Sequence, residues 1–565
     1  MRPIHGDVRG LRAAQRGALE RTYRRKVSPD QVVSTELARH LCALSREIGR
    51  QVGVLLTRDG AVSKVIVGDA RQLEIPDIGR LRGGPGRFRR LRLVHTHLRG
   101  EGLSTDDLND LALLRLDLVA VVQAEADGSA GAIEVAYLAP SAAGAAAPEA
   151  ASDKGVGSEA LFLRVEAPQV YALDLDFAAT IREVEREFGR YRGGREATKE
   201  RALVIGVRPE DDHFAETVEL VRSAGVEVAG KLRQRRSRVH PRTVVGRGKL
   251  TDIVLQSMRA GAEVAIFDID LKPAQARAFE DATGLKAIDR TQLILDVFAQ
   301  RARSRDGKLQ VELAQLRYSL PRLTEKDAGL SRLTGGIGGR GPGETVLEVG
   351  RRRIRDRIRN LERQVEKLSR QRDVARSRRR DRRVPVLSLI GYTNAGKSTL
   401  LNALTRSAVE TAGKLFVTLD PTSRRIRFPR EGEVVITDTV GFIAELPPDL
   451  VRAFRATLEE LGDADLLLHV VDAADQGWRT KVEAVERLIA ELSLNSKPLL
   501  VVLNKCDLVT EEHARRMAGQ LDAVAVSART RAGFRRLIDR AEEAMGRAAP
   551  LLPGARAGRG AAAAR

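Results

Sequence analysis

The chain has 565 residues, 43% hydrophobic and 30% charged, which is typical of soluble globular domains and too long for a single core. Lys and Arg outnumber Asp and Glu by 96 to 76, a net charge of +20, so a polyanionic partner is expected; a basic surface kept for solubility is the alternative. Two cysteines exclude a disulfide framework, and no apolar run is long enough for a membrane span or a secretory signal. We expect a cytosolic monomer without a membrane span, with peripheral membrane association as the alternative localisation.

The first predicted domain covers residues 1–138 and ends at a low-complexity Ala/Pro/Ser/Gly linker, residues 139–160. This α+β domain contains "LRLVHTHLRGEGLSTDDLNDL", in which His95 and His97 precede Asp107. The pattern resembles the JAMM metal motif, in which two histidines and an aspartate bind zinc. The resemblance implies a zinc site at these three residues.

The motif departs from the JAMM pattern in three ways. The gap between His97 and Asp107 is one residue short, Leu98 replaces the usual proline, and the candidate general base Glu47 is too far from the "GVLL" run that begins at Gly53. A catalytic zinc needs three well-placed ligands and a base. The departures favour a JAMM-like fold without activity over a zinc site.

In the next predicted domain, residues 161–300, short apolar runs alternate with amphipathic segments. "ALVIGV" is followed by "VEVAG", "VAIFDI" and "KAIDR", each separated by a helical pattern. Alternating strands and helices predict an open parallel sheet, so this is expected to be a small α/β domain.

Residues 301–383 have the pattern of two helices that pair in an antiparallel hairpin. Apolar residues recur at spacings of three and four in both arms, and Pro321 is expected to end or kink the first arm. Residues 351–383 hold 16 Lys/Arg against 5 Asp/Glu, which is more than pairing along one helix can use. We expect this arm to contact RNA. The seam residues are Leu309, Leu313, Leu316, Leu320 and Leu323 in the first arm, and Leu347, Ile354, Ile358, Leu361, Val365 and Leu368 in the second.

A P-loop follows the apolar strand "VPVLSLI" at the start of the last predicted domain, residues 384–548; the tail 549–565 is expected to be disordered. Its backbone N–H groups and the following helix N-terminus are suited to cradling phosphates. Lys397 is predicted to bridge the β- and γ-phosphates, and the Ser398 hydroxyl to bind Mg²⁺.

The base is predicted from "LNKCD" and from the strand "AVAVSA" further on. Asp507 can accept hydrogen bonds from two N–H groups of guanine, whereas adenine offers no such pair of donors. Asn504 is expected to bind the imidazole side of the base, and the stem of Lys505 to pack on its face. Ser527 and Ala528 are placed to offer a backbone N–H to the guanine carbonyl.

The γ-phosphate sensor is predicted in "VVITDTVGF". Asp438 is expected to hold Mg²⁺ through water, and the Gly441 N–H to bond the γ-phosphate. In "KLFVTLDPT", Thr418 is the first candidate for the switch hydroxyl that closes over Mg²⁺, and Thr422 competes with it. The full set of predicted nucleotide contacts is Gly391, Tyr392, Thr393, Asn394, Ala395, Gly396, Lys397, Ser398, Thr399, Asp438, Gly441, Asn504, Lys505, Asp507, Ser527 and Ala528.

Two positions bear on hydrolysis. Phe442 stands where Ras-like GTPases carry the glutamine that orients water, so slow intrinsic turnover is expected. Asn394 occupies the position that binds K⁺ in some P-loop GTPases; either it binds K⁺, or it only stabilises the loop. The predicted catalytic set is Lys397, Thr418, Gly441 and Asn394.

Several long stretches resemble the HflX family of GTPases, in the Obg–HflX group, over roughly residues 201–548. They are "HPRTVVGRGKL" (240–250), "IDRTQLILDVFAQRARSRDGKLQVELAQL" (288–316), "GGIGGRGPGETVLE" (335–348), "LFVTLDPTSRRI" (415–426) and "DTVGFIAELPPDLVRAFRATLEE" (438–460). The resemblance implies a factor that binds GTP, GDP and the large ribosomal subunit with its rRNA, and that splits or rescues ribosomes under stress. The alternative is an assembly factor that uses GTP only as a timer. The hairpin tip, about residues 323–344, would reach toward the peptidyl transferase centre.

Overall fold

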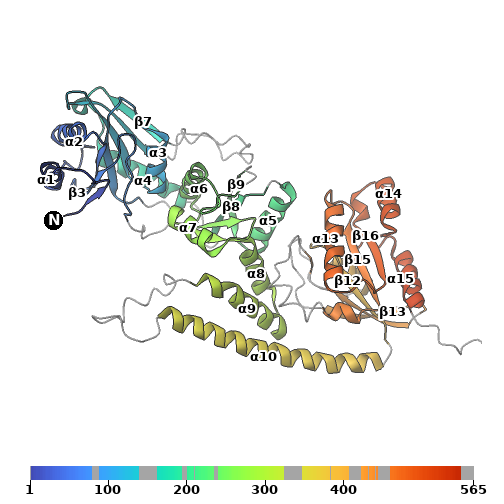
Figure 1. The fold of residues 1–565 in the computed structure, drawn as a ribbon. Coiled ribbons are helices and arrows are strands. Elements are labelled where there is room, and N and C mark those ends of the chain that lie inside the picture. Colours follow the sequence, from blue (N-terminus) through green and yellow to red (C-terminus); the bar gives the residue numbers. More distant parts are fainter. Residues whose placement is uncertain are drawn as a thin grey trace, which may run out of the picture. The chain divides into compact units, whose positions relative to one another are not determined.

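The computed structural model describes residues 2–78, 88–138, 162–193, 200–208, 210–234, 239–323, 346–381, 384–405, 422–430, 432–438, 441–442 and 459–548. The chain divides into two compact units, one made of Met1–Phe214 and Gly225–Arg290, the other of Ala215–Ala224 and Thr291–Arg565. It is an α/β protein, as predicted, and its described residues form three separate sheets (Figure 1). The predicted linker, most of the hairpin tip, Thr418 and the predicted tail lie outside the described residues.

The first sheet has seven strands in the order β1-β3-β2-β4-β5-β6-β7. Two pairs, β1 with β3 and β4 with β5, are parallel, and the other pairs are antiparallel. The strands are β1 (Ile4–Gly6), β2 (Val52–Thr57), β3 (Val62–Val67), β4 (Leu91–His97), β5 (Leu118–Ala124), β6 (Ala130–Leu138) and β7 (Phe162–Ala167).

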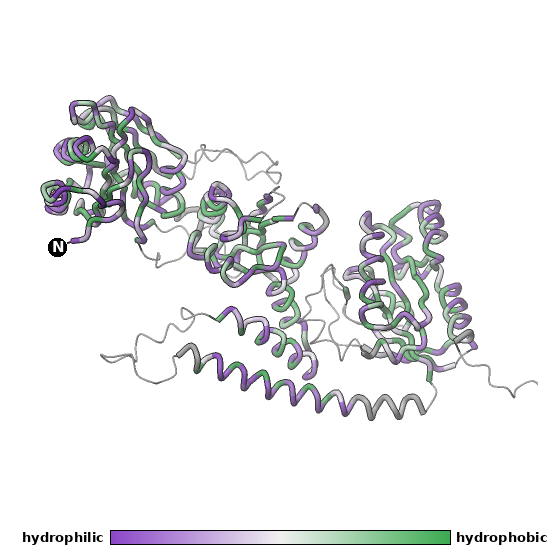
Figure 2. Tube along the Cα trace, in the orientation of Figure 1, coloured by the Kyte–Doolittle hydropathy of each residue, from purple (hydrophilic) through white to green (hydrophobic). Residues whose placement is uncertain are grey.

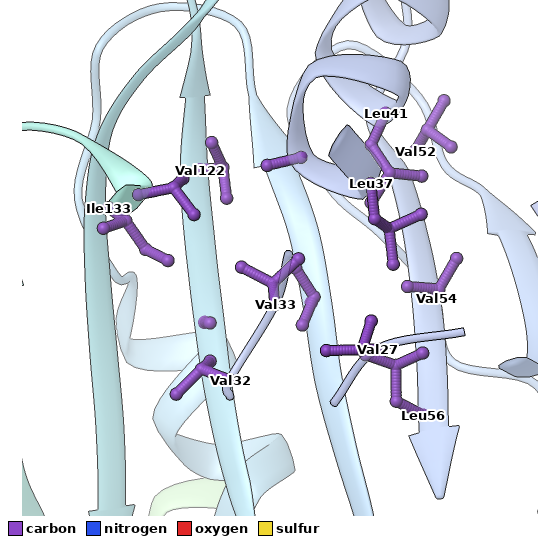
Figure 3. Packing of buried hydrophobic residues seen from close by; sticks show 14 of the residues in the cluster. Val27, Val32, Val33, Leu37, Leu41, Val52, Val54, Leu56, Val122 and Ile133 are labelled. Atoms are coloured by element: carbon purple, nitrogen blue, oxygen red, sulfur yellow. The ribbon is translucent and has the colours of Figure 1, made fainter. Parts of the chain in front are cut away.

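Both faces of this sheet are covered by helices. α1 (Ala13–Thr22) and α2 (Thr35–Ile48) cover one face, where Leu37 and Leu41 pack against Val52 and Val54 of β2 (Figure 3). α3 (Thr105–Leu113) covers the opposite face through Leu108 and Leu111. Side chains alternate between the two faces along each strand, so β4 and β5 have buried residues at nearly every position.

The segment beyond the predicted linker returns to this first sheet, so the boundary expected at residue 161 differs from the structure. β7 pairs antiparallel with β6, from Ile133↔Ala167 to Leu138↔Phe162. α4 (Phe177–Gly193) then buries Phe177 and Phe188 in the two cores of the same domain. A low-complexity stretch indicates a domain boundary by composition alone, whereas the apolar residues after it complete the N-terminal core.

The second sheet is the predicted open parallel sheet, with strand order β11-β10-β8-β9. Its helix α6 buries Val254 and Met258 in the core beneath α3, so the first and second sheets share packed side chains. The elements are β8 (Arg201–Gly206), α5 (Asp211–Ser223), β9 (Glu227–Arg233), α6 (Arg247–Ala260), β10 (Val264–Phe267), α7 (Pro273–Thr283) and β11 (Lys286–Ile288).

The predicted helical hairpin is formed by α9 (Arg305–Ser319) and α10 (Val346–Asp381), after α8 (Arg290–Arg301). α9 ends before Pro321, which lies in a 3₁₀ turn. Leu361 of α10 is fully buried, whereas most arginines between residues 351 and 371 of that helix are exposed. In Figure 2 the coloured part of α10 is mainly hydrophilic, with hydrophobic positions recurring along it.

The third sheet has the order β13-β14-β12-β15-β16-β17, parallel except for the pairing of β13 with β14. Its elements are β12 (Val386–Ile390), α11 (Lys397–Thr405), β13 (Thr422–Phe428), β14 (Gly432–Asp438), β15 (Leu466–Asp472), α13 (Trp478–Glu491), β16 (Leu499–Asn504), α14 (Glu511–Leu521), β17 (Val524–Ala525) and α15 (Phe534–Ala548). Among the described residues, no helix combines the length and the apolar character needed to span a membrane.

Candidate functional site

The P-loop connects β12 to α11, and its backbone conformation explains its residues. Gly391 has φ +143°, Gly396 has φ +89° and Asn394 has φ +64°, all in a region that favours glycine or asparagine. A Cβ atom on Gly391 would lie 2.3 Å from the Val470 carbonyl oxygen, and one on Gly396 would lie 2.3 Å from Asn504 Nδ2. A side chain at either position would therefore clash with a neighbouring residue, and the backbone conformation at both positions also favours glycine.

Lys397 begins α11 and folds back over the loop. Its Nζ donates hydrogen bonds of 2.9 Å to the carbonyl oxygens of Gly391 and Tyr392. Burial lowers the pKa of Lys397 to about 8, and the negative charge of Asp438 opposes that shift. The lysine is thus held over the loop by two neutral acceptors, in a position from which phosphate oxygens can take over its donors.

Ser398 and Asp438 form the polar pair on which the predicted magnesium site depends. The register of β12 with β14 puts Asp438 beside Leu389, next to the start of the loop. The Ser398 hydroxyl donates a 2.6 Å hydrogen bond to Asp438 Oδ2, and Asp438 is fully buried. Hydroxyl and carboxylate oxygens suit a hard cation, so this pair fits Mg²⁺ beside bound phosphates.

The segment after β14 is joined to the P-loop by main-chain hydrogen bonds. The Phe442 N–H donates to Gly391 O at 3.1 Å, and the Thr393 N–H donates to Phe442 O at 2.7 Å. A Cβ on Gly441 would lie 3.1 Å from Lys397 Nζ, so the main chain at Gly441 is adjacent to the phosphate-binding lysine. Any side chain at Gly441 would occupy that space.

Phe442 is a core residue. Its ring is 4% exposed and packs with Ile390 and Leu467 in a cluster that includes residues of α13. The side chain therefore cannot orient an attacking water, and the packing explains why an apolar residue stands at this position.

The predicted switch threonines have different outcomes. Thr418 lies outside the described residues. Thr422 begins β13 and pairs with Asp438 across the antiparallel ladder, so its main chain is at the edge of the predicted magnesium site. The choice between Thr418 and Thr422 stays a prediction.

The residues predicted to read the base come from the ends of β16 and β17. Asn504 Nδ2 donates to the Ala395 carbonyl at 3.0 Å, and Asn504 Oδ1 accepts from the Ala528 N–H at 3.0 Å. Asn504 therefore joins the P-loop to the Ser527–Ala528 turn. The Ala528 N–H, expected to bind the guanine carbonyl, donates to Asn504 Oδ1 in this structure.

Asp507 is exposed, as a carboxylate awaiting the edge of a base must be. The buried Ser527 hydroxyl donates a 2.6 Å hydrogen bond to Asp507 Oδ1, which orients the carboxylate. Lys505 has φ +62°, and its Nζ lies 2.7 Å from Asp472 Oδ2.

Sequence reasoning missed Asp472, although there was a signal for it. It ends β15, a strand that neighbours β16 in a parallel sheet, and the register places it opposite Asn504. Its ion pair with Lys505 holds the lysine stem on which the base is expected to pack.

In the N-terminal domain, His95, His97 and Asp107 come together, with their ligand atoms within 4.8 Å of one another. The candidate base Glu47 is exposed near the end of α2 and does not belong to this group. The geometry of a predicted metal site is present there, without the predicted base.

Family models match three consecutive parts of the chain. The model described as GTP-binding GTPase N-terminal matches residues 211–299, the GTP-binding GTPase middle region matches 301–379, and the 50S ribosome-binding GTPase model matches 386–505. Residues 1–210 lie outside these matches.

Curated relatives carry the name GTPase HflX. The chain is 46% identical to the protein of Caldanaerobacter subterraneus over 347 residues, covering 61% of this chain and 80% of the relative. It is 46% identical to the Escherichia coli protein, covering 58% of this chain and 77% of that one. Among solved structures it is similar to a GTP-binding protein from Sulfolobus solfataricus in complex with GDP, at 23% identity, with 62% and 100% of the two chains covered and a TM-score of 0.35. The chain therefore belongs to the HflX family of GTPases and is a GTP-binding, GTP-hydrolysing enzyme.

Proposed function

We propose that this GTPase binds the large ribosomal subunit through its helical hairpin and that, in the GTP state, it splits ribosomes into subunits. The observation that carries the proposal is the exposed arginine surface of α10, in a chain whose GTPase domain matches a model described as 50S ribosome-binding. A single helix with this excess of positive charge has more cations than its neighbours can neutralise, and rRNA phosphates supply the missing anions.

The nucleotide acts as the switch. GTP brings a γ-phosphate to Lys397 and to the main chain at Gly441. Ser398 and Asp438 would hold Mg²⁺, which would supply positive charge to the phosphates. The segment containing Gly441 is hydrogen-bonded to the P-loop, so its conformation depends on which phosphate is present. Hydrolysis removes that contact and releases the protein from the ribosome.

Sucrose-gradient sedimentation separates splitting from the alternative role as an assembly timer. Intact bacterial ribosomes are incubated with the full chain and non-hydrolysable GTP. We expect intact particles to convert to subunits, with the protein on the large subunit. Asp507→Ala, which lacks the carboxylate that reads guanine, is the matched control and leaves the particles intact. Binding to the large subunit without conversion favours the timer, and no binding at all rejects the ribosomal role.

We further propose that K⁺ completes the hydrolytic site through Asn394, since Phe442 is packed in the core and supplies no polar group. The Asn394 side chain is exposed, and its backbone is left-handed. Asn394→Gly keeps that backbone accessible while it removes the amide oxygen. We expect wild-type GTP turnover to be faster in KCl than in NaCl of equal ionic strength, and the difference to disappear in Asn394→Gly. Equal rates for the wild type in both salts would reject the K⁺ site and leave Asn394 as a loop residue only.

A further inference from the structure

The strongest cluster of metal-ligating side chains outside the GTP site lies between β4 and α3 in the N-terminal domain. His95 and His97 are two positions apart on β4, so both side chains point to the face covered by α3. Thr96, between them, points to the opposite face and donates a hydrogen bond to Ser45 of α2. Asp107 lies in the first turn of α3, directly over the two histidines.

The distances fit one metal ion. Asp107 Oδ1 lies 3.2 Å from His95 Nε2, and Asp107 Oδ2 lies 3.8 Å from His97 Nε2. Ligands about 2 Å from a common tetrahedral centre lie about 3.3 Å apart. The three ligand atoms, all within 4.8 Å of one another, therefore need only small side-chain rotations to surround an ion.

Burial makes His95 hard to explain without a ligand. The residue is 1% exposed; among the described residues its Nδ1 has no hydrogen-bond partner, and its Nε2 faces the Asp107 carboxylate at 3.2 Å. A buried ring nitrogen that forms no hydrogen bond costs stability, so native structures seldom contain one. A metal ion shared by Nε2 and the Asp107 carboxylate would fix the ring in this buried position.

The surrounding groups orient the other two ligands. His97 Nδ1 lies 3.1 Å from the Glu101 carbonyl, which favours a proton on Nδ1 and leaves the Nε2 lone pair free. The Ser104 N–H and hydroxyl both donate to Asp107 Oδ2, at 2.8 and 2.7 Å, and this leaves Oδ1 toward His95. Gly53 faces His95 across the sheet, and a Cβ there would lie 2.9 Å from the Cβ of His95.

We propose that His95, His97 and Asp107 bind a divalent transition metal, with zinc as the best match to two imidazoles and one carboxylate, and water at the open position. The ion would tie β4 to the start of α3. The same helix holds α6 of the second sheet, because Asp110 accepts from Arg247 at 2.5 Å and Asn109 accepts from Thr251 at 2.7 Å. Metal binding therefore stabilises the packing of the N-terminal domain on the α/β domain.

The test uses the full chain, stripped with a chelator, dialysed and titrated with Zn²⁺ against a chromophoric competitor. Elemental analysis of the reloaded protein is expected to give one zinc per chain, and the melting temperature is expected to rise with zinc. Asp107→Asn keeps an acceptor for Ser104, so the helix cap and the fold are retained. It should weaken zinc binding more than about 100-fold and abolish the thermal shift.

Asp106→Asn, in the same turn of α3, is the matched control and should bind zinc as the wild type does. His97→Gln provides a second ligand variant, and circular dichroism checks that each variant is folded. Elemental analysis of protein purified without added metal distinguishes zinc from iron or manganese. Zinc below one-tenth of an equivalent after reloading, or equal affinity in Asp107→Asn and the wild type, would overturn the proposal.

Discussion

At the scale of single residues, Lys397 shows how the site is suited to phosphate. Its ammonium group is buried and has only carbonyl oxygens within hydrogen-bond distance on the loop, while Asp438 supplies the compensating charge. Burial lowers the pKa of His469 to about 4, and the nearby charge of Lys397 adds to that shift. A phosphate chain would give Lys397 the anionic partners that two neutral carbonyls do not.

We expect GDP binding to take up a proton at Lys397. The pKa is about 8 in the free protein instead of 10.5, and phosphate oxygens favour the charged form. Proton uptake should therefore increase as pH rises toward and above 8, and affinity should fall about fourfold between pH 7 and pH 8.5. Calorimetry in two buffers of different ionisation enthalpy measures the uptake. A binding enthalpy that is independent of the buffer at pH 8.5 would contradict the assignment.

Asp507 is expected to select guanine because its carboxylate can accept hydrogen bonds from two N–H groups of that base. Asp507→Asn replaces one acceptor oxygen by an amide donor, which suits the second carbonyl of xanthine and repels the amine of guanine. We expect GDP affinity to fall about 100-fold or more, and affinity for xanthosine diphosphate to exceed it. Competition against a fluorescent nucleotide reports both affinities. Asp522→Asn is the control, since Asp522 is exposed and left-handed and asparagine tolerates that backbone.

At the scale of elements, different residues of α10 stabilise the hairpin and face solvent, where a partner can bind them. Arg357 pairs with Glu312 through two hydrogen bonds of 2.8 and 2.9 Å, but both side chains are nearly half-exposed, so the pair contributes little to stability. The fully buried Leu361 contributes more to the pairing of α9 with α10. The exposed arginines are therefore available for another partner at small cost to the hairpin.

We expect the triple variant Arg353→Glu, Arg355→Glu, Arg363→Glu to lose binding to the large ribosomal subunit while it keeps its melting temperature. All three side chains are exposed on α10, and Coulomb attraction to phosphates is replaced by repulsion. Co-sedimentation over a series of salt concentrations gives the affinity and its salt dependence. Arg487→Glu, Arg515→Glu, Arg516→Glu changes the net charge equally on α13 and α14 and should bind as the wild type does. Equal losses in both variants would mean that only total charge matters.

At the scale of the whole molecule, the sequence was most informative where a short motif specifies both the functional residues and the local structure that holds them. The strand–loop–helix around Lys397 and the buried strand before Asn504 were predictable because short spacings specify local geometry. The resemblance to the JAMM motif also grouped His95, His97 and Asp107, which the structure brings together. The burial of Phe442 was not predictable, because it depends on α13, more than thirty residues further along the chain.

The return of β7 to the first sheet was also beyond prediction from composition. "FLRVEA" follows the low-complexity segment and has the pattern expected of a strand that opens the next domain. Its antiparallel pairing with β6 is a long-range contact that no local spacing specifies. Such contacts depend on which parts of the folded domain would otherwise stay uncovered. Here these parts are the edge of the sheet at β6, which β7 covers, and the core beneath α4.

The assignment of β7 and α4 to the first domain predicts how the whole chain responds to a cut. We introduce a specific protease site between residues 145 and 150 and cleave the folded protein. The two fragments should co-elute on size exclusion and separate only in denaturant, because β7 pairs along six residues with β6, and Phe177 and Phe188 are buried in the N-terminal cores. A fragment ending at residue 138, expressed alone, should be poorly soluble because its core is incomplete; one ending at residue 193 should be more soluble. Spontaneous separation of the cleaved fragments, or a stable folded domain ending at residue 138, would restore the boundary suggested by composition.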